Sequence, residues 1–424
     1  MEAPPHYRSK QLPVRWLILS LGGFVAGSLL AAGLALWQSR TSAPPLAANL
    51  CTRISPSRGD VSPHPNCRSV PPVSWRSPWQ TVPTTLTQGL DFYQAASHFD
   101  QPRYPVANPP PFVAEASSAS PHALERIVWG AVGLLADKGL PTDVVSVSLV
   151  DLKAPCCQYA QFQDQQARYP ASVVKLFWLV ALYNHYQTGR MSPEAALHPD
   201  DELLTVHYSN NGAASRVLDA VTQTQSGASL TGNDWADWLA ARQTINDYFL
   251  RAHYPDLNIA HKTFPVPDLG MTERTGRDLQ FAAGETLGKE HPLTRNYLTT
   301  RAAARLLYEI ETGQAVAAEY SDRLKAHLRH STDPAIWQTT ESNAIAGFFG
   351  EYLPPDVQLY TKLGFTFDEG RQEAAIIISP DNQTRFVLVM FANDPMYSTG
   401  DVTAFPAVAR YIYDRMQQRQ ATPP

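Results

Sequence analysis

The chain has 424 residues with a formal net charge of −5, and 17% of them are charged, so no basic footprint indicates a nucleic-acid partner. Its 12 histidines form no His-Glu-x-x-His or similar ligand pattern, and we expect neither a metal nor another cofactor. The four cysteines, Cys51, Cys67, Cys156 and Cys157, show neither zinc spacing nor a Cys-x-x-Cys pair. Cys51 could bridge Cys67 in an oxidising compartment, which the sequence leaves open, whereas a bridge between two adjacent cysteines would be strained.

The N-terminal region predicts a membrane anchor. Residues 1–13 are polar and basic, and residues 14–37 carry no charge after Arg15 and have a tryptophan near each end. About 20 apolar residues span a bilayer, and tryptophan favours its interfaces. We therefore expect a cytoplasmic tail, a single transmembrane signal-anchor helix, and a remainder that faces the periplasm or the exterior. Signal cleavage near Ala43 and a buried core helix are the alternatives.

Residues 38–120 form a separate region in which proline and serine recur and neither helical nor strand periodicity persists. This composition is typical of a semi-extended linker. Its aromatic residues leave open that part of it packs on the folded domain or binds a partner.

Residues 121–424 have the periodicities of one folded domain. Helices are expected at 122–138, 172–187, 235–251, 299–310, 321–330 and 402–417, with a short one from 213 and an irregular stretch over 253–291. Strands are expected at 143–151, 158–163, 358–365, 373–379 and 385–393. Strands at both ends with helices between them indicate an α+β fold. We expect an antiparallel sheet with an inserted helical block, and the first and last helices should cover one face of the sheet.

Ser172-Val-Val-Lys175 stands where a turn opens an apolar helix. Residues three apart on a helix share a face, so the Ser172 hydroxyl and the Lys175 amine should lie together. A serine nucleophile needs a base, and a buried lysine whose ammonium form is disfavoured can be that base. The free N–H groups of a helix start would favour a developing oxyanion. S-x-x-K alone is a weak pattern, and an ordinary serine and lysine are the alternative.

Two later stretches complete an ordered set of motifs. Ser209-x-Asn211 lies at a loop-to-helix junction in the helical block, and Lys362-x-Gly364 lies on the first of the three C-terminal strands. Each has a structural alternative. The first stretch could be an ordinary helix cap and turn, and the second an exposed strand lysine beside a bulge glycine.

The ordered set S-x-x-K, S-x-N and K-x-G resembles the serine β-lactamase and penicillin-binding-protein superfamily, most closely its class A β-lactamase-like branch, over about residues 121–420. The resemblance implies the β-lactamase/transpeptidase-like fold. It also implies that Ser172 attacks a carbonyl to form an acyl-enzyme while Lys175 accepts or relays the proton.

The remaining roles follow from the same resemblance. Ser209 and Lys362 would carry a proton to the leaving nitrogen, and Asn211 would bind the substrate amide and orient the lysine of the first motif. Gly364 would let the substrate lie against the strand. The backbone N–H groups of Ser172 and Phe365 would form the oxyanion hole.

The chain departs from the family pattern at several positions. Asn210 stands where β-lactamases often have Asp, and Leu363 replaces the usual Thr or Ser, which removes a hydroxyl for a substrate carboxylate. Arg371 could supply a guanidinium for that carboxylate, or it could be an exposed turn residue. The deacylating glutamate of class A enzymes has two upstream candidates, Glu285 and Glu290, neither in the familiar Glu-x-x-Leu-Asn context, and both could be surface residues.

These observations predict a membrane-anchored serine hydrolase whose substrate is a β-lactam or a peptidoglycan D-alanyl peptide. If no glutamate serves in deacylation, a slow-deacylating penicillin-binding or cell-wall sensor module is the alternative. An esterase or amidase that uses the same Ser-Lys dyad is a further one.

Overall fold

The structure is a computed structural model that describes residues 123–152, 158–193, 197–254, 257–267, 270–284, 295–340 and 343–421. The predicted tail (1–13), transmembrane segment (14–37) and linker (38–120) and the four cysteines lie outside these residues. Within the described part of the chain, no helix is long and apolar enough to cross a membrane.

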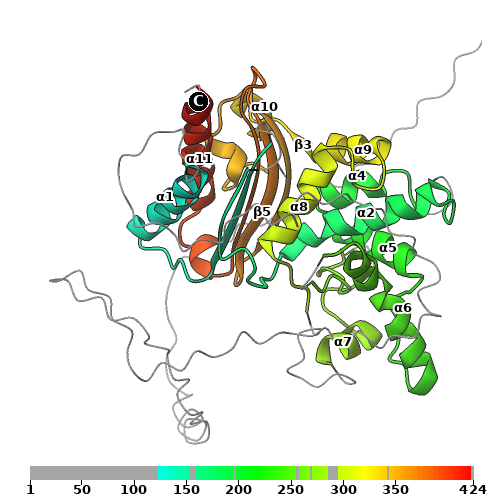
Figure 1. Ribbon diagram of the computed structural model, residues 1–424. Helices are drawn as coiled ribbons and strands as arrows, with labels where there is room; N and C mark the ends of the chain where they lie inside the picture. The colour runs from blue at the N-terminus through cyan, green and yellow to red at the C-terminus, as the bar shows by residue number, and fades with distance from the viewer. Residues whose placement is uncertain are drawn as a thin grey trace, which may run out of the picture. The chain divides into compact units, whose positions relative to one another are not determined.

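The centre of the domain is a six-stranded sheet in the order β2-β1-β6-β5-β4-β3 in which every neighbouring pair is antiparallel (Figure 1). The strands are β1 (Val145–Asp151), β2 (Gln158–Phe162), β3 (Arg329–His330), β4 (Gln358–Thr366), β5 (Gly370–Ile378) and β6 (Arg385–Ala392). The last three strands form consecutive hairpins, and the first two join the free side of β6. The two ends of the domain thus share one sheet, as predicted.

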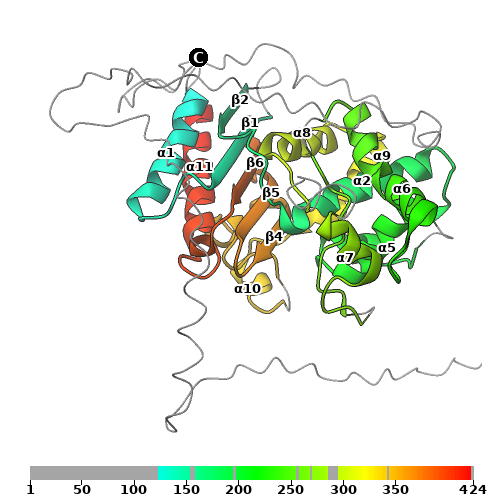
Figure 2. The same cartoon turned by 90° about the horizontal axis from the view of Figure 1, so that it is seen from below.

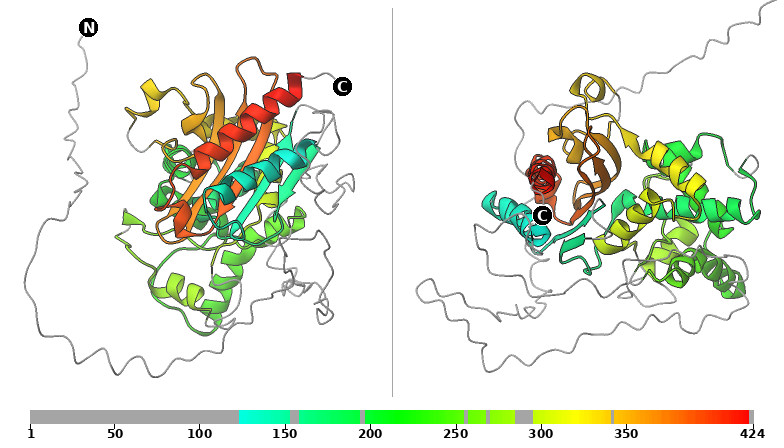
Figure 3. Two further views of the ribbon diagram at one scale, coloured as in Figure 1. Left: turned by 90° about the vertical axis from the view of Figure 1, so that its left-hand side faces the viewer. Right: turned by 45° about the horizontal axis from the view of Figure 1, so that its top comes forward.

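Two terminal helices cover one face of the sheet, α1 (Ala123–Asp137) and α11 (Ala404–Ala421) (Figures 2 and 3). The apolar side chains of α1 recur at helical spacing, and they pack with α11 and that face of the sheet into one buried cluster. The two helices approach closely at Gly130, where an added Cβ would lie 2.0 Å from the Tyr411 hydroxyl. The predicted covering of one sheet face is confirmed.

A block of helices covers the other face (Figure 2). It contains α2 (Val174–Gln187), α4 (Asp201–Val206), α5 (Asn211–Thr222), α6 (Gly232–Arg251), α7 (Gly276–Ala283), α8 (Thr300–Glu311) and α9 (Ala318–Leu328). Every residue of α2 from Val174 to Tyr186 is buried, so this helix is the centre of the block. A helix buried on all sides has a fixed position, and α2 carries the first motif at its N-terminal end.

Three local features differ from the predictions. The expected irregular stretch contains α7, whose Phe281 stacks on His261 with ring centroids 3.9 Å apart. The segment before the second motif forms the one-and-a-half-turn helix α4. The predicted helix 321–330 ends at Leu328, and its last two residues form β3 on the edge of the sheet. These short elements depend on tertiary contacts, since each is too short to show a clear period.

Candidate active site

Ser172 lies in a one-turn 3-10 helix, η3 (Ala171–Val173), which leads directly into α2. Between Ala171 and Tyr186, Ser172 is the single residue that is not buried. The preceding Ala171 has φ +44°, a conformation that non-glycine residues rarely adopt and that occurs mainly where a functional geometry requires it. The local fold therefore leaves Ser172 partly accessible at the start of an otherwise buried helix.

The Lys175 amine is buried and has only neutral hydrogen-bond acceptors among the described residues. It donates to the Ser209 carbonyl (2.7 Å), to Asn211 Oδ1 (2.7 Å) and to Ser209 Oγ (3.3 Å). Burial lowers the pKa of Lys175 well below its usual value, and the nearby charge of Lys362 lowers it further. A lysine in this environment has access to its neutral form, which is the form that can accept a proton.

Ser209 is the point at which the second and third motifs meet. Its Oγ accepts hydrogen bonds from Lys175 (3.3 Å) and from Lys362 (2.9 Å), which stand on α2 and β4. Ser209 has φ +54°, again in the left-handed region, so the chain turns sharply here. The following Asn210 caps α5 by accepting a bond from the Ala213 N–H (2.7 Å). The stretch is thus both a helix cap and the meeting point of two lysines.

Lys362 is not the exposed strand lysine of the alternative interpretation, because it is 1% exposed. Its ammonium donates to Ser209 Oγ and to the Leu363 carbonyl (2.8 Å). Burial lowers the pKa of Lys362 to about 7, although the charge of Glu373 opposes that shift. This amine therefore changes its charge near neutral pH.

Gly364 lies directly against the turn that carries Ser172. A Cβ at Gly364 would lie 2.6 Å from the Pro170 carbonyl oxygen and 3.1 Å from the Ser172 nitrogen. The glycine is paired with Gln372 within a continuous ladder, so it is not a bulge. The expectation that Gly364 leaves room for substrate needs correction, since the space above its Cα is filled by the protein's own turn. The glycine instead allows η3 to pack on β4.

This packing places the two predicted oxyanion donors on facing segments. Ser172 N lies beside Gly364, and Phe365 is the next residue on β4. Backbone N–H groups on two rigid elements are suited to hold an oxyanion, because their positions need no reorganisation.

The proposed carboxylate role of Arg371 is wrong. Arg371 pairs with Phe365, so its side chain lies on the opposite face of the sheet from Lys362. It is buried, and its guanidinium donates to the carbonyls of Tyr397, Gly347 and Ser398 at 2.8, 2.9 and 3.3 Å. Those bonds hold loops on the far face, which also excludes the alternative of an exposed turn arginine.

Two residues that the sequence analysis did not select contact the site through Asn211. Thr263 Oγ1 donates to Asn211 Oδ1 (2.9 Å), and Asn211 Nδ2 donates to the Pro265 carbonyl (2.7 Å). Nothing in their local sequence marks either residue, because both come from the stretch read as irregular. In the described segments, no carboxylate is hydrogen-bonded to Lys175 or Asn211, and the two deacylation candidates, Glu285 and Glu290, lie outside them.

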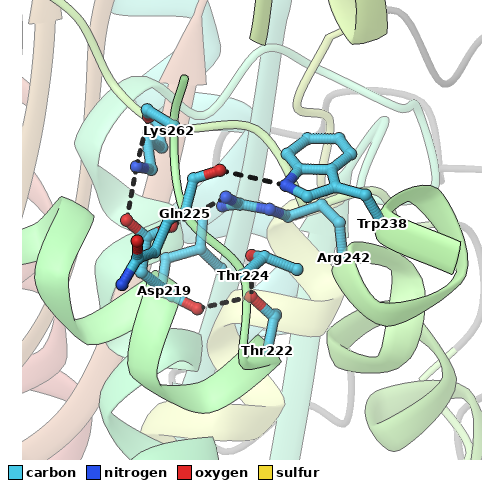
Figure 4. A network of polar contacts seen from close by, with 9 residues as sticks. Asp219, Thr222, Thr224, Gln225, Trp238, Arg242 and Lys262 are labelled. Carbon is cyan, nitrogen blue, oxygen red and sulfur yellow. Dashed lines mark hydrogen bonds and ion pairs between the residues drawn. The ribbon is translucent and has the colours of Figure 1, made fainter. Parts of the chain in front are cut away.

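The segment that carries Thr263 is tied to the helical block by a buried ionic network (Figure 4). Asp219 on α5 accepts from Arg242 on α6 (2.7 Å) and from Lys262 (2.6 Å), and Lys262 also donates to Ser226 Oγ (2.6 Å). The side chains of Arg242 and Lys262 are fully buried. The network therefore fixes residue 262 next to the threonine that contacts Asn211.

Comparison with known proteins gives one family and many similar folds. The model of a beta-lactamase enzyme family matches residues 138–416. A class A beta-lactamase from Bacteroides cellulosilyticus is 16% identical, with 70% of this chain and 99% of that chain covered at a TM-score of 0.47. A beta-lactamase from Sphaerobacter thermophilus is 17% identical, with 70% and 98% covered at 0.46, and the protein PBP-A is 15% identical, with 69% and 96% covered at 0.47. No curated protein matches the chain.

Proposed function

Because the chain belongs to the beta-lactamase enzyme family, within the serine β-lactamase and penicillin-binding-protein superfamily, we propose that it forms an acyl-enzyme at Ser172 with a β-lactam or a D-alanyl-peptide amide. The observation that carries the proposal is the shared hydroxyl of Ser209, which accepts bonds from both buried lysines. Two lysines with lowered pKa values on one hydroxyl provide a path for a proton between nucleophile and leaving group.

The proposed reaction uses each group once. Ser172 Oγ attacks the carbonyl carbon, and its proton passes to the neutral amine of Lys175. The N–H groups of Ser172 and Phe365 stabilise the oxyanion. When the C–N bond breaks, Ser209 Oγ gives its proton to the leaving nitrogen and takes another from Lys362.

The test is to mix the purified full chain with a chromogenic cephalosporin and with a fluorescent penicillin. Turnover of the cephalosporin supports a β-lactamase, and a stable fluorescent label supports a penicillin-binding protein. Both signals should disappear in Ser172→Ala and persist in Ser229→Ala, a matched change at an exposed serine. If neither reagent reacts but esters are cleaved, and Lys175→Ala abolishes that cleavage, the esterase or amidase alternative holds. If Ser172→Ala reacts at the wild-type rate, Ser172 is not the nucleophile.

Slow deacylation is the second candidate, and the surroundings of Asn211 favour it. Among the described residues, the Asn211 side chain has hydrogen bonds with Thr263, the Pro265 carbonyl and Lys175. None of these partners is a carboxylate that could activate water. We expect the acyl-enzyme to persist for minutes or longer. If the acyl-enzyme turns over rapidly, Glu285→Gln and Glu290→Gln identify the deacylation base. The variant that lacks the base should still be acylated, but it should keep the fluorescent label bound.

We also propose that residues 14–37 anchor the protein, with residues 1–13 in the cytoplasm and the catalytic domain in the periplasm or outside the cell. The support is the long uncharged apolar run that follows the basic N-terminal residues. Alkaline extraction of membranes should leave the wild-type chain in the pellet and release Leu29→Asp/Leu30→Asp. Release of the wild-type chain would contradict the anchor.

A further inference from the structure

A buried carboxylate lies behind the strand that carries Lys362. Glu373 on β5 is fully buried and pairs with Leu363 on β4, the residue that follows this lysine. Paired residues of neighbouring strands share a face of the sheet, and successive residues of one strand alternate between the two faces. Glu373 therefore lies on the face that α1 and α11 cover, and Lys362 lies one residue along the ladder on the face of the helical block.

The carboxylate of Glu373 is hydrogen-bonded to two neutral donors. The Thr361 hydroxyl donates to Oε1, and the Phe349 N–H, at the start of the short 3-10 helix η6 (Phe349–Tyr352), donates to Oε2, both at 2.7 Å. Among the described residues, no lysine or arginine forms an ion pair with it. Arg371, two residues away on the same strand, directs its guanidinium to three backbone carbonyls instead.

The hydrogen bonds of Glu373 do not require its charge. A glutamine could accept from the Phe349 N–H through its oxygen and donate to the Thr361 hydroxyl through its nitrogen. A buried carboxylate, in contrast, is costly unless an opposite charge stabilises it. Burial raises the pKa of Glu373 to about 8, against its two hydrogen bonds and the charges of Arg371 and Lys362, which lower it. A titratable acid at this position therefore calls for a reason beyond packing.

The charges around Glu373 come from few residues. In the described part of the chain, the cations that act on it are Lys362 and Arg371. Glu351 on η6 is a second acid near that arginine, and it accepts from the Gly347 N–H at 2.5 Å. The residue opposite Glu373 on β6 is the apolar Met390. Since the arginine is held by carbonyls, the lysine is the cation whose protonation can respond to Glu373.

The titratable groups that surround Lys362 on the other face are bases. Lys175 lies close enough for the charge of Lys362 to lower its pKa, after the larger effect of burial. The same holds for His207 and His330, which stack on each other with ring centroids 4.1 Å apart. Burial and neighbouring bases both favour loss of a proton from an amine. An ammonium in this environment needs a negative charge to persist.

Glu373 is the acid in a position to supply that charge. The Lys362 ammonium donates to Ser209 Oγ and to the Leu363 carbonyl, and in the described segments no carboxylate is bonded to it. Leu363 is also the residue that pairs with Glu373, so the ammonium and the carboxylate lie on either side of one strand. The charge of Glu373 raises the pKa of Lys362 against the effect of burial. The two groups titrate in the same pH range, and the charge of each favours that of the other.

We propose that Glu373 is a positioning residue for the proton of Lys362, because its buried carboxylate is the counter-charge that keeps this amine protonated for delivery to Ser209. This inference rests on the proposed acyl transfer, in which Lys362 returns a proton to Ser209 as the C–N bond breaks. Glu373 acts through the sheet without contact with the substrate. It extends the reaction to higher pH, because the carboxylate becomes charged where the amine would otherwise lose its proton.

The pH dependence of acylation in Glu373→Gln tests the proposal. Stopped-flow labelling of the full chain by fluorescent penicillin is measured from about pH 5.5 to about pH 9. Without the carboxylate the pKa of Lys362 should fall, and the alkaline limb should move about one unit to lower pH. The rate should be about tenfold below wild type at about pH 8.5 and within about twofold of it at about pH 5.5. An equal loss at every pH, which a purely structural role would give, or an unmoved limb overturns the proposal.

The matched control is Glu351→Gln, which removes a carboxylate from η6 and should leave the alkaline limb in place. Thr361→Val removes one donor to the carboxylate and keeps the shape of the side chain. This change disfavours the charged form of Glu373, so the limb should move in the same direction by a smaller amount. If Glu373→Gln does not fold, an unmoved limb in Thr361→Val overturns the proposal.

A measurement without substrate separates this inference from the proposed function. NMR titration of the full chain labelled with ¹³C at lysine Cε, with the signal assigned through Lys362→Arg, gives the pKa of Lys362 directly. That pKa should be lower in Glu373→Gln than in the wild type. If the wild type is not labelled by penicillin but the pKa falls in the variant, the acyl transfer is wrong and the counter-charge role of Glu373 is supported. If the pKa is the same in both proteins, the inference is wrong whatever the activity.

Discussion

Two buried lysines in this domain have opposite surroundings. Lys175 is 0% exposed and donates to a carbonyl, an amide oxygen and a hydroxyl, while Lys262 is 2% exposed and is paired with Asp219 at 2.6 Å (Figure 4). Burial lowers the pKa of both amines, but the Asp219 carboxylate opposes the shift at Lys262, and the charge of Lys362 reinforces it at Lys175.

The difference shows that burial alone does not make a lysine a base. A buried ammonium beside a carboxylate stays charged and holds structure together, whereas one surrounded by neutral acceptors and a second cation tends to lose its proton. The two sites are also connected, because Lys262 is the neighbour of Thr263, which donates to Asn211. In the proposed reaction one buried lysine, Lys175, accepts the proton, whereas the other, Lys262, holds the segment beside it.

The largest expected effect comes from replacing each lysine by methionine, which keeps length and apolar bulk. Lys175→Met should lower the acylation rate about 10²–10⁴-fold, the usual contribution of a general base, with little change in Tm. Lys262→Met should lower the rate at most about tenfold, because it acts only through the position of Thr263. Stopped-flow labelling with fluorescent penicillin measures both acylation rates. Equal losses of rate in the two variants would contradict the different roles given to Lys175 and Lys262.

The structural role of the ionic network around Lys262 is tested by Asp219→Asn. This change leaves the Arg242 and Lys262 cations buried without their shared carboxylate, and breaking such a pair costs about 3 kcal/mol or more. Urea unfolding should show that loss of stability. The exposed Asp322→Asn is the control and should stay within about 0.5 kcal/mol of wild type. An unchanged midpoint for Asp219→Asn would mean that the network does not hold the block together.

Gly364→Ala should disturb the chemical site through packing. Its Cβ would lie 2.6 Å from the Pro170 carbonyl oxygen, so η3 and β4 must separate, at a cost of about 1–3 kcal/mol. Acylation should fall as well, because the Ser172 N–H moves away from the strand. Gly133→Ala is the matched control on α1, where an added Cβ meets nothing within 4 Å and should stabilise the helix slightly. A fully active and stable Gly364→Ala would contradict the close packing.

The smallest expected effect concerns pH. The pKa of Lys362 is about 7, so the acylation rate should fall as pH rises through that value and this amine loses its proton. Lys362→Arg keeps a cation at all accessible pH, and the alkaline limb should therefore move to higher pH. If the alkaline limb of the variant stays near pH 7, the loss of rate arises from the titration of a group other than Lys362.

The lowered pKa of Lys362 also predicts how the stability of the fold depends on pH. The unfolded lysine has a pKa of about 10.4, so between about pH 7 and pH 10 the unfolded chain binds one more proton at this residue than the folded chain does. The contribution of Lys362 to stability should therefore rise with pH across that window. In Lys362→Met, urea midpoints measured from pH 7 to 10 should lack this rise.

Much of the fold was predictable because periodicity is local. The short apolar runs of β5 and β6, the strand pattern of β4 and the helical spacing of α1 predicted their elements within a few residues. The segments α4, α7 and β3 were missed. Each is short, and α7 and β3 are held by contacts from elsewhere, such as the stacking of Phe281 on His261 and the pairing of β3 with β4.

The sequence by itself determined the candidate groups, since Ser172 and Lys175 are one helical turn apart and the two later motifs follow in a defined order. Only the tertiary structure decided what each group does. It buried Lys175 among neutral acceptors, placed Arg371 on the far face through strand register, and brought Thr263 against Asn211. The physical reason is that the pKa of a side chain and its reach depend on distances and burial in space, which spacing along the chain does not specify.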